Sequence, residues 1–170
     1  MTGRTHLIFG IGIGLIGTAT CYMLTGDFDA ATSLCAGCAI GSLFPDLDIP
    51  DSTISKYIPI IPHIINKIFG HRNFFHSPIF LLILYLLLSY FFPEYIFLIQ
   101  GFSIGFMTHQ LLDMFNKSGI PLFYPFTKKR FNLFSVKSGS KNELLIAMIV
   151  YLFFFTGFIY FLMRAALFIK

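Results

Sequence analysis

Long apolar runs dominate this sequence and limit what the chain can fold into. We distinguish five of them, at about 5–24, 30–44, 78–92, 94–115 and 144–169. A helix needs about 20 mostly apolar residues to cross a bilayer, and the second and third runs are the shortest of the set. The chain is 56% hydrophobic and only 12% charged, which is far from the composition of a soluble globular protein. We therefore predict an all-α, multi-pass transmembrane bundle of about five helices.

The length of 170 residues predicts one integral-membrane domain over 1–170, with the site in 5–125 and a C-terminal span over 144–169. The first run follows Arg4, as in a signal peptide, but no convincing cleavage site comes after it, so we predict an uncleaved span. Cys21, Cys35 and Cys38 all fall within apolar runs. We interpret them as small packing residues without a disulfide or a redox role.

The distribution of charge predicts an orientation. The segment 116–142 carries six cations and no acid, Arg4 precedes the first run, and the connection after that run carries only Asp27 and Asp29. Under the positive-inside rule, the N-terminus and the connections 45–77 and 116–142 face the cytoplasm of a bacterial-type inner membrane. The basic segment has two readings, a topology signal or a binding surface for anionic lipid headgroups.

Small residues divide the runs into two kinds. The first, second and fourth contain glycines at helical spacing, including Gly10, Gly14 and Gly105, whereas the third and fifth are bulky. Glycines let helix backbones approach closely in lipid. We predict a tight core of helices one, two and four, flanked by three and five. Prolines predict a turn at 93–94 and a short surface helix from Pro62.

Histidines and aspartates gather at the cytoplasmic ends of the predicted helices. His6 opens the first run, Asp46 and Asp48 follow the second, and the sequence His71-Arg-Asn-Phe-Phe-His76 precedes the third. His109 and Asp113 end the fourth run, four residues apart and therefore on one helix face. We predict that these side chains converge at a cytoplasm-facing interfacial site and bind metal.

Each of these residues alone also has a structural reading. His6 could be an interfacial histidine, Asp46 or Asp48 a loop or cap residue beside proline, and Arg72 a cytoplasmic anchor. For His109 and Asp113 this reading is weaker, because ionisable groups on an apolar helix are costly and usually have a functional partner.

The mixture of imidazole and carboxylate ligands favours a transition metal over magnesium or calcium. We expect a divalent ion, zinc first and manganese as the alternative, in one or two copies held by these predicted ligands: His6, Asp46, Asp48, His71, His76, His109 and Asp113. Asp48 or Asp46 could instead be a general base. Arg72 is assigned to catalysis and to the substrate, because guanidinium forks onto phosphate. The other predicted substrate-binding residues are Ser77, Lys128, Lys129 and Arg130.

These motifs resemble the YdjM-like family of membrane-bound, metal-dependent hydrolases. The resemblance covers roughly 5–125, and the matching elements in chain order are Thr5-His6, Pro45-Asp46-Leu47-Asp48, His71-Arg72, His76-Ser77, His109 with Asp113, and Gly119 followed by Pro125. More remotely, the His-xxx-Asp pair and the isolated aspartates are similar to zinc-dependent phospholipase C and P1-type nucleases, which are all-helical phosphoesterases.

The resemblance implies a hydrolase, and we predict cleavage of a phosphoester of lipid or headgroup type by metal-activated water. Expected partners are membrane lipids and a phospholipid-like substrate. The sequence contains no recognisable nucleic-acid-binding module and does not fix the oligomeric state. Two alternatives remain, a metal or ion transporter and a non-enzymatic membrane scaffold. Transporters usually place charged ligands near the membrane midplane, which argues against the first of these.

Overall fold

The computed structural model describes residues 1–50, 52, 55, 60–69 and 73–168, and the described part is helical with two isolated β-bridges. The long helices are α1 (Gly3–Thr25), α2 (Phe28–Leu43), α4 (Pro78–Phe91), α5 (Ile96–Met114) and α6 (Lys141–Phe168). Shorter helices connect them: η1 (Phe44–Asp48), α3 (Ile60–Phe69), η3 (Phe74–His76) and η4 (Pro93–Tyr95). The all-α prediction is confirmed.

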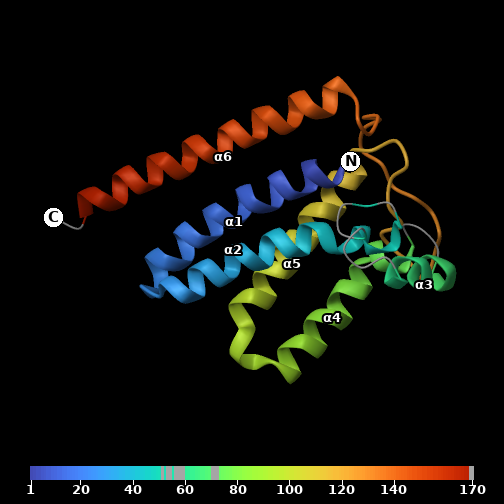
Figure 1. Cartoon of the computed structure of the whole chain (residues 1–170), viewed down its shortest axis with the longest axis horizontal. Coiled ribbons are helices and arrows are strands. Elements are labelled where there is room, and N and C mark those ends of the chain that lie inside the picture. The colour runs from blue at the N-terminus through green and yellow to red at the C-terminus, as the bar shows by residue number, and fades with distance from the viewer. Residues whose placement is uncertain (51, 53–54, 56–59, 70–72, 169–170) are drawn as a thin grey trace.

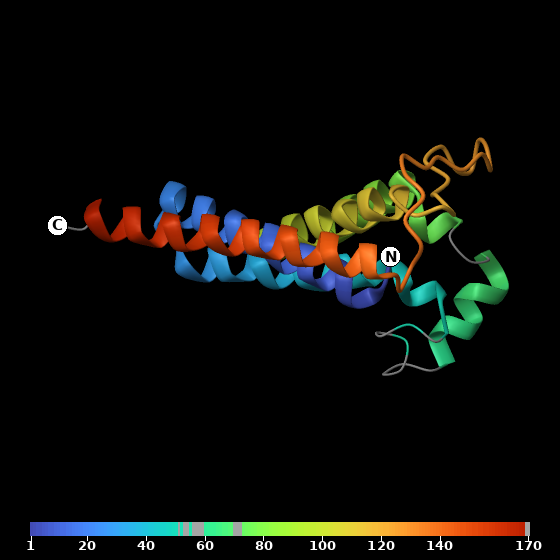
Figure 2. The same cartoon turned by 90° about the horizontal axis from the view of Figure 1, so that it is seen from above.

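The helices run back and forth, so that one end of the bundle collects many of their termini. Figure 1 shows the start of α1, the end of α2, the start of α4, the end of α5 and the start of α6 at the same end of the molecule. The C-terminus lies at the opposite end in both views (Figures 1 and 2). We call the first of these the site end. All of the predicted ligands that the structure describes lie there.

Local sequence signals set the helix boundaries. The Thr2 hydroxyl accepts from the Thr5 amide at the start of α1, and Gly26 ends α1 with a left-handed φ of 69°.

Side-chain caps also begin the next helices. The Asp27 carboxylate accepts from the Ala30 amide and begins α2. Ser77 and Pro78 together begin α4, since Ser77 accepts from the Phe80 amide and proline suits the first helical position.

The core of the bundle is a close contact between α2 and α5, with α1 packed on α2. A Cβ added at Gly41 would overlap the Phe102 carbonyl of α5, and one added at Gly105 would overlap the Cys38 carbonyl of α2. A Cβ at Gly14 of α1 would lie 3.0 Å from the Cys35 sulfur. These approaches are possible only because glycine has no side chain. The prediction that the first, second and fourth runs form the tight core is confirmed.

The span prediction is refined at α4. The helices long and apolar enough to cross a membrane are Gly3–Thr25, Phe28–Asp48 and Lys141–Phe161 among the described residues. The pair α4 and α5 qualifies together but is bent by 118° at the break between them. With 14 residues α4 is about 21 Å long, short of the ~30 Å hydrocarbon core. Pro93 accounts for the break, as predicted for this turn.

The connections at the site end contain the predicted surface helix and an irregular segment. Helix α3 begins at Ile60, two residues before Pro62, and exposes the side chains of Ile60 and Ile64. The segment between α5 and α6 contains turns and the isolated bridges Asn116–Val136 and Ile120–Phe131. Both connections therefore surround the site end without adding a helix to the core.

Candidate metal centre

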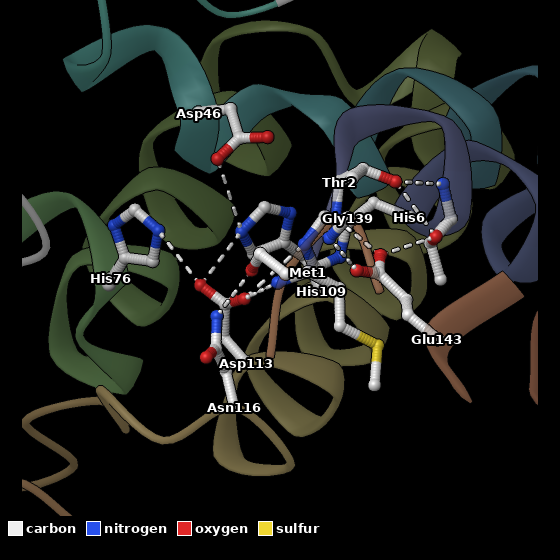
Figure 3. Close-up of polar contacts among 12 residues, drawn as sticks. Met1, Thr2, His6, Asp46, His76, His109, Asp113, Asn116, Gly139 and Glu143 are labelled. Carbon is white, nitrogen blue, oxygen red and sulfur yellow. Dashed lines mark hydrogen bonds and ion pairs between the residues drawn. The ribbon is translucent and has the colours of Figure 1, made fainter. Parts of the chain in front are cut away.

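Buried histidines and aspartates converge at the site end from four elements (Figure 3). Helix α1 supplies His6, η1 supplies Asp46 and Asp48, η3 supplies His76, and α5 supplies His109 and Asp113. Asp46 keeps 5% of its surface exposed, and the other members of the cluster are completely buried. Burying this many ionisable groups is costly unless each has a compensating partner, and the Met1 ammonium group, 2.7 Å from Asp113 Oδ1, is one such partner among the described residues.

Asp113 lies at the centre of the cluster. Its Oδ1 atom is 3.3 Å from His6 Nε2, and its Oδ2 atom is 3.7 Å from both His76 Nε2 and His109 Nε2. The Met1 ammonium group also lies 2.7 Å from Oδ1. One carboxylate thus faces imidazole nitrogens from three separate elements.

The orientation of His109 is fixed by the backbone of α2. His109 Nδ1 lies 2.8 Å from the Ser42 carbonyl oxygen, which can only accept a hydrogen bond. With the proton on Nδ1, the lone pair of Nε2 faces Asp46 Oδ1 and Asp113 Oδ2, each at 3.7 Å. In the neutral ring three electron-rich atoms face one another, and a metal cation between them would relieve the repulsion; in the protonated ring Nε2 would instead donate to the carboxylates.

The short helix η1 directs its two carboxylates to different histidines. Helix α2 ends at Leu43, and Pro45 lies in the first turn of the 3₁₀ helix η1, in which residues two positions apart point in different directions. Asp46 consequently reaches His109, while Asp48 Oδ2 lies 3.4 Å from His76 Nδ1. The sequence Pro-Asp-Leu-Asp thus serves two parts of the cluster with one turn of chain.

His76 is held on both sides. Its backbone carbonyl accepts from Gln110 Nε2 of α5 at 3.1 Å, and Asp48 faces its Nδ1 atom. Burial lowers the pKa of His76 below its usual value, which favours the neutral ring. A neutral imidazole is the form that binds metal, and a carboxylate behind a ligating histidine is a common supporting contact.

The separations between donor atoms fit a metal ion. Zinc bonds of about 2.1 Å in a tetrahedron place the ligand atoms about 3.4 Å apart. The measured separations of 3.3–3.7 Å between imidazole nitrogens and carboxylate oxygens lie close to that value. Two groups of donor atoms lie within 4.8 Å of one another, His6 with Asp46 and His109, and His76 with His109 and Asp113. Among the described residues, both His6 ring nitrogens and His109 Nε2 also lack a hydrogen-bond partner.

Other predicted site residues lie elsewhere. The Ser77 hydroxyl donates to the Phe74 carbonyl and accepts from the Phe80 amide, so it serves as the cap of α4. The predicted substrate-binding residues of the basic loop are exposed and outside the buried cluster: Lys128, Lys129 and Arg130. His71 and Arg72 lie outside the described residues.

Sequence reasoning missed several supporting groups. Glu143, from the start of α6, is 2% exposed and accepts from the Thr2 amide, the Thr5 hydroxyl and the Gly139 amide. Gln110 and the Ser42 carbonyl were also missed. A signal existed for Glu143, because it is an acid at the start of an otherwise apolar run and ionisable residues there usually have a partner.

Comparisons with known proteins place the chain in a family. The sequence pattern of the YdjM inner membrane protein family matches residues 1–169. The chain belongs to the YdjM inner membrane protein family. Inner membrane protein YdjM of Escherichia coli (strain K12) is 31% identical over 163 residues, covering 89% of this chain and 80% of that protein. Uncharacterized protein YvsG of Bacillus subtilis (strain 168) is 35% identical over 147 residues, covering 86% and 87%.

The YdjM family match confirms the predicted family and extends it beyond the predicted 5–125 to nearly the whole chain. No solved structure matches the chain. The remote similarity to zinc-dependent phospholipase C and P1-type nucleases therefore stays a prediction. Function has to be argued from the cluster itself.

Proposed function

We propose that this YdjM-family protein is a membrane-embedded, metal-dependent hydrolase that cleaves a phosphoester of lipid type. One observation carries the proposal. Nδ1 of the His109 ring lies at the Ser42 carbonyl. Nε2 of the same ring faces one carboxylate oxygen of Asp46 and one of Asp113, each at 3.7 Å, inside a buried site. If His109 is neutral, this arrangement buries the Nε2 lone pair against carboxylate oxygens, and a bound cation would relieve that repulsion. When bound, a divalent metal would polarise a phosphoester and activate water for attack on it.

The donor set suits one or two transition-metal ions. His6, Asp46 and His109 form one group of donor atoms, and His76 with Asp113 and His109 forms the other. His109 belongs to both groups, but its Nδ1 faces Ser42, so only its Nε2 is available to one ion. A second ion would therefore depend on Asp113. The Oδ1 atom of Asp113 lies toward His6 and its Oδ2 atom toward His76. Nitrogen with oxygen donors favours zinc, with manganese as the alternative.

The remaining residues take supporting roles. Asp48 faces the far side of the His76 ring from Asp113, so we assign it to orienting that imidazole. Asp46 stays a metal donor in the first group, with His6 and His109. Arg72 keeps its proposed role on the phosphate, because a guanidinium pairs with phosphate oxygens in two-point contact.

The proposal includes a membrane orientation. We propose that α1, α2, the α4–α5 pair and α6 cross the inner membrane and that the site end faces the cytoplasm. The cationic segment 116–142 at that end supports this orientation. The position of the cluster at the end of the helices rather than at mid-membrane also favours a hydrolase over a transporter.

The test is metal content and hydrolysis of the purified protein. We expect transition metal in the wild-type protein and hydrolysis of phosphoester substrates that chelation abolishes and added metal restores. Asp113→Asn keeps the shape of the side chain but removes the charge, so metal should be lost and hydrolysis should fall by about 100-fold or more. Asp29→Asn is the matched control, because Asp29 is exposed and lies at the start of α2, away from the site end.

Several outcomes would contradict the proposal. Wild-type protein without bound metal, or full hydrolysis after chelation, would rule out a metal-dependent hydrolase. Metal-dependent ion flux in liposomes without hydrolysis would favour the transporter. A size-exclusion profile of Asp113→Asn that matches the wild type keeps loss of metal distinct from loss of folding.

A further inference from the structure

An apolar groove lies between α4 and α5 beside the metal cluster. It measures about 410 Å³, within the range of ~300–1,000 Å³ that small-molecule sites occupy. Its walls come from Leu81, Leu82 and Tyr85 of α4 and from Ser103, Met107 and Leu111 of α5. Figure 1 shows α4 and α5 both extending from their connecting turn toward the site end. The groove therefore lies on the flank of the bent helix pair.

One end of the groove adjoins the cluster. Its lining includes Gln110 and Met114, which directly follow the cluster residues His109 and Asp113 in α5. Gln110 is 6% exposed, and its Nε2 atom donates to the His76 carbonyl. Gln110 is thus a polar group at the boundary between the apolar groove and the elements that hold the histidines.

The direction and length of the groove match half of a bilayer. From Met114 to Ser103, α5 rises by about 16 Å, running from the site end toward the middle of the bundle. One leaflet of the hydrocarbon core is about 15 Å thick. A lipid of the leaflet at the site end would have its headgroup beside the cluster and an acyl chain along this wall.

We propose that this groove holds one acyl chain of the substrate, and that the substrate is a membrane phospholipid or lipid phosphate rather than a water-soluble phosphoester. The inference rests on the proposed function and adds to it the place where the lipid chain of the substrate binds. Apolar side chains from both helices would replace the neighbouring lipid chains, while the phosphoester stays at the headgroup level near the histidines. A soluble phosphoester would leave these walls unused.

Photolabelling tests the groove without requiring hydrolysis. The probe is a non-hydrolysable phosphonate analogue of phosphatidic acid with a diazirine at the end of one acyl chain, in nanodiscs. The control probe carries the same chain on a diacylglycerol without phosphate. We expect the phosphonate probe to label the peptides 78–85 and 103–114 more strongly than the control probe does. Both probes should label α6 equally, because α6 is largely exposed along its length.

A matched pair of variants tests the groove through turnover. Met107 lines the groove and Met148 lies on α6, and both side chains are 53% exposed. Met107→Trp places a larger side chain in the groove, so roughly two methylenes of the bound acyl chain should lose their contact with its wall. Hydrolysis of long-chain phosphatidic acid should then fall by about tenfold, because each buried methylene contributes about 0.8 kcal/mol to binding. Hydrolysis of p-nitrophenyl phosphate, which has no acyl chain, should fall much less. Met148→Trp should change neither activity.

The opposite results would overturn the inference. Equal labelling of the groove by both probes would mean ordinary lipid contact. If Met107→Trp and Met148→Trp change hydrolysis equally, the groove does not bind the substrate. The same conclusion follows if Met107→Trp lowers hydrolysis of phosphatidic acid and of p-nitrophenyl phosphate by the same factor. Failure of the proposed function is read separately, as absence of metal and of hydrolysis in the wild-type protein.

Discussion

The contact between α2 and α5 and the exposed helix α6 show opposite relations between hydrophobicity and burial. The α6 window Lys141–Phe161 is the most apolar of the candidate spans, yet only 6% of it is buried. The window Phe28–Asp48 is the least apolar of them and is 56% buried. In water the more apolar helix would be the buried one. In lipid, bulky apolar side chains can stay outside, and small residues mark the faces that pack.

The largest expected effect on stability comes from adding one methyl group to a glycine in the contact between α2 and α5. Gly105→Ala places a Cβ against the Cys38 carbonyl of α2, where the backbone has no room to move aside cheaply. We expect a loss of about 3 kcal/mol in the free energy of unfolding, at the upper end of the usual overpacking cost. Thermal unfolding of the protein in detergent measures this loss.

Gly157→Ala is the matched control on α6. A Cβ at Gly157 meets no atom within 4 Å, and alanine favours a helix over glycine by up to about 1 kcal/mol. The control should therefore leave the protein as stable as the wild type or slightly more stable. Equal losses from both substitutions would contradict the assignment of α2 and α5 as the packed core.

Removal of metal should destabilise the cluster end of α5 but not α6, and this loss should be smaller than the loss from Gly105→Ala. The cluster joins α1, η1, η3 and α5, whereas α6 supplies none of its predicted ligands. A ligand at 100 times its dissociation constant stabilises the folded state by about 2.7 kcal/mol, and chelation would remove that contribution. Hydrogen exchange should show lost protection at 105–114 and unchanged protection at 150–160. Unchanged exchange at 105–114 would mean that no metal had joined these elements.

Much of the site could be predicted because its parts are local signals. An acid or histidine at the end of an apolar run is visible in the sequence, and the i, i+4 spacing of His109 and Asp113 fixes one helix face. The glycine pattern likewise identified the packed helices. These features depend on helix periodicity and on the cost of burying charge, and neither requires knowledge of the tertiary structure.

Other parts depend on contacts that the sequence does not encode locally. The Ser42 carbonyl orients His109 across 67 residues, and no side-chain pattern marks a backbone oxygen as a partner. Ser77 was predicted to bind substrate, and the structure adds that its hydroxyl caps α4. Glu143 was overlooked because the predicted last apolar run began one residue after it, at 144, although its side chain joins the start of α6 to the start of α1 across 138 residues.

The smallest expected effect tests that last contact, where the exposed helix meets the core. Glu143 Oε1 accepts from the Thr2 amide and the Thr5 hydroxyl, each at 2.6 Å, and Oε2 accepts from the Gly139 amide at 2.7 Å. Glu143→Gln replaces one acceptor oxygen with an NH₂ group, so an amide or hydroxyl donor is left facing another donor. We expect a loss of about 1–2 kcal/mol, measured by thermal unfolding.

Glu94→Gln is the control for this substitution, because Glu94 is exposed in the α4–α5 turn. It should change stability by no more than about 0.5 kcal/mol. Since Thr5 directly precedes His6, loss of the Glu143 contact should also loosen the start of α1 and increase hydrogen exchange there. A Glu143→Gln protein as stable as the Glu94→Gln protein would mean that α6 is held by its lipid surroundings. In that case the buried polar contact at its first turn would contribute nothing to joining the exposed helix to the core.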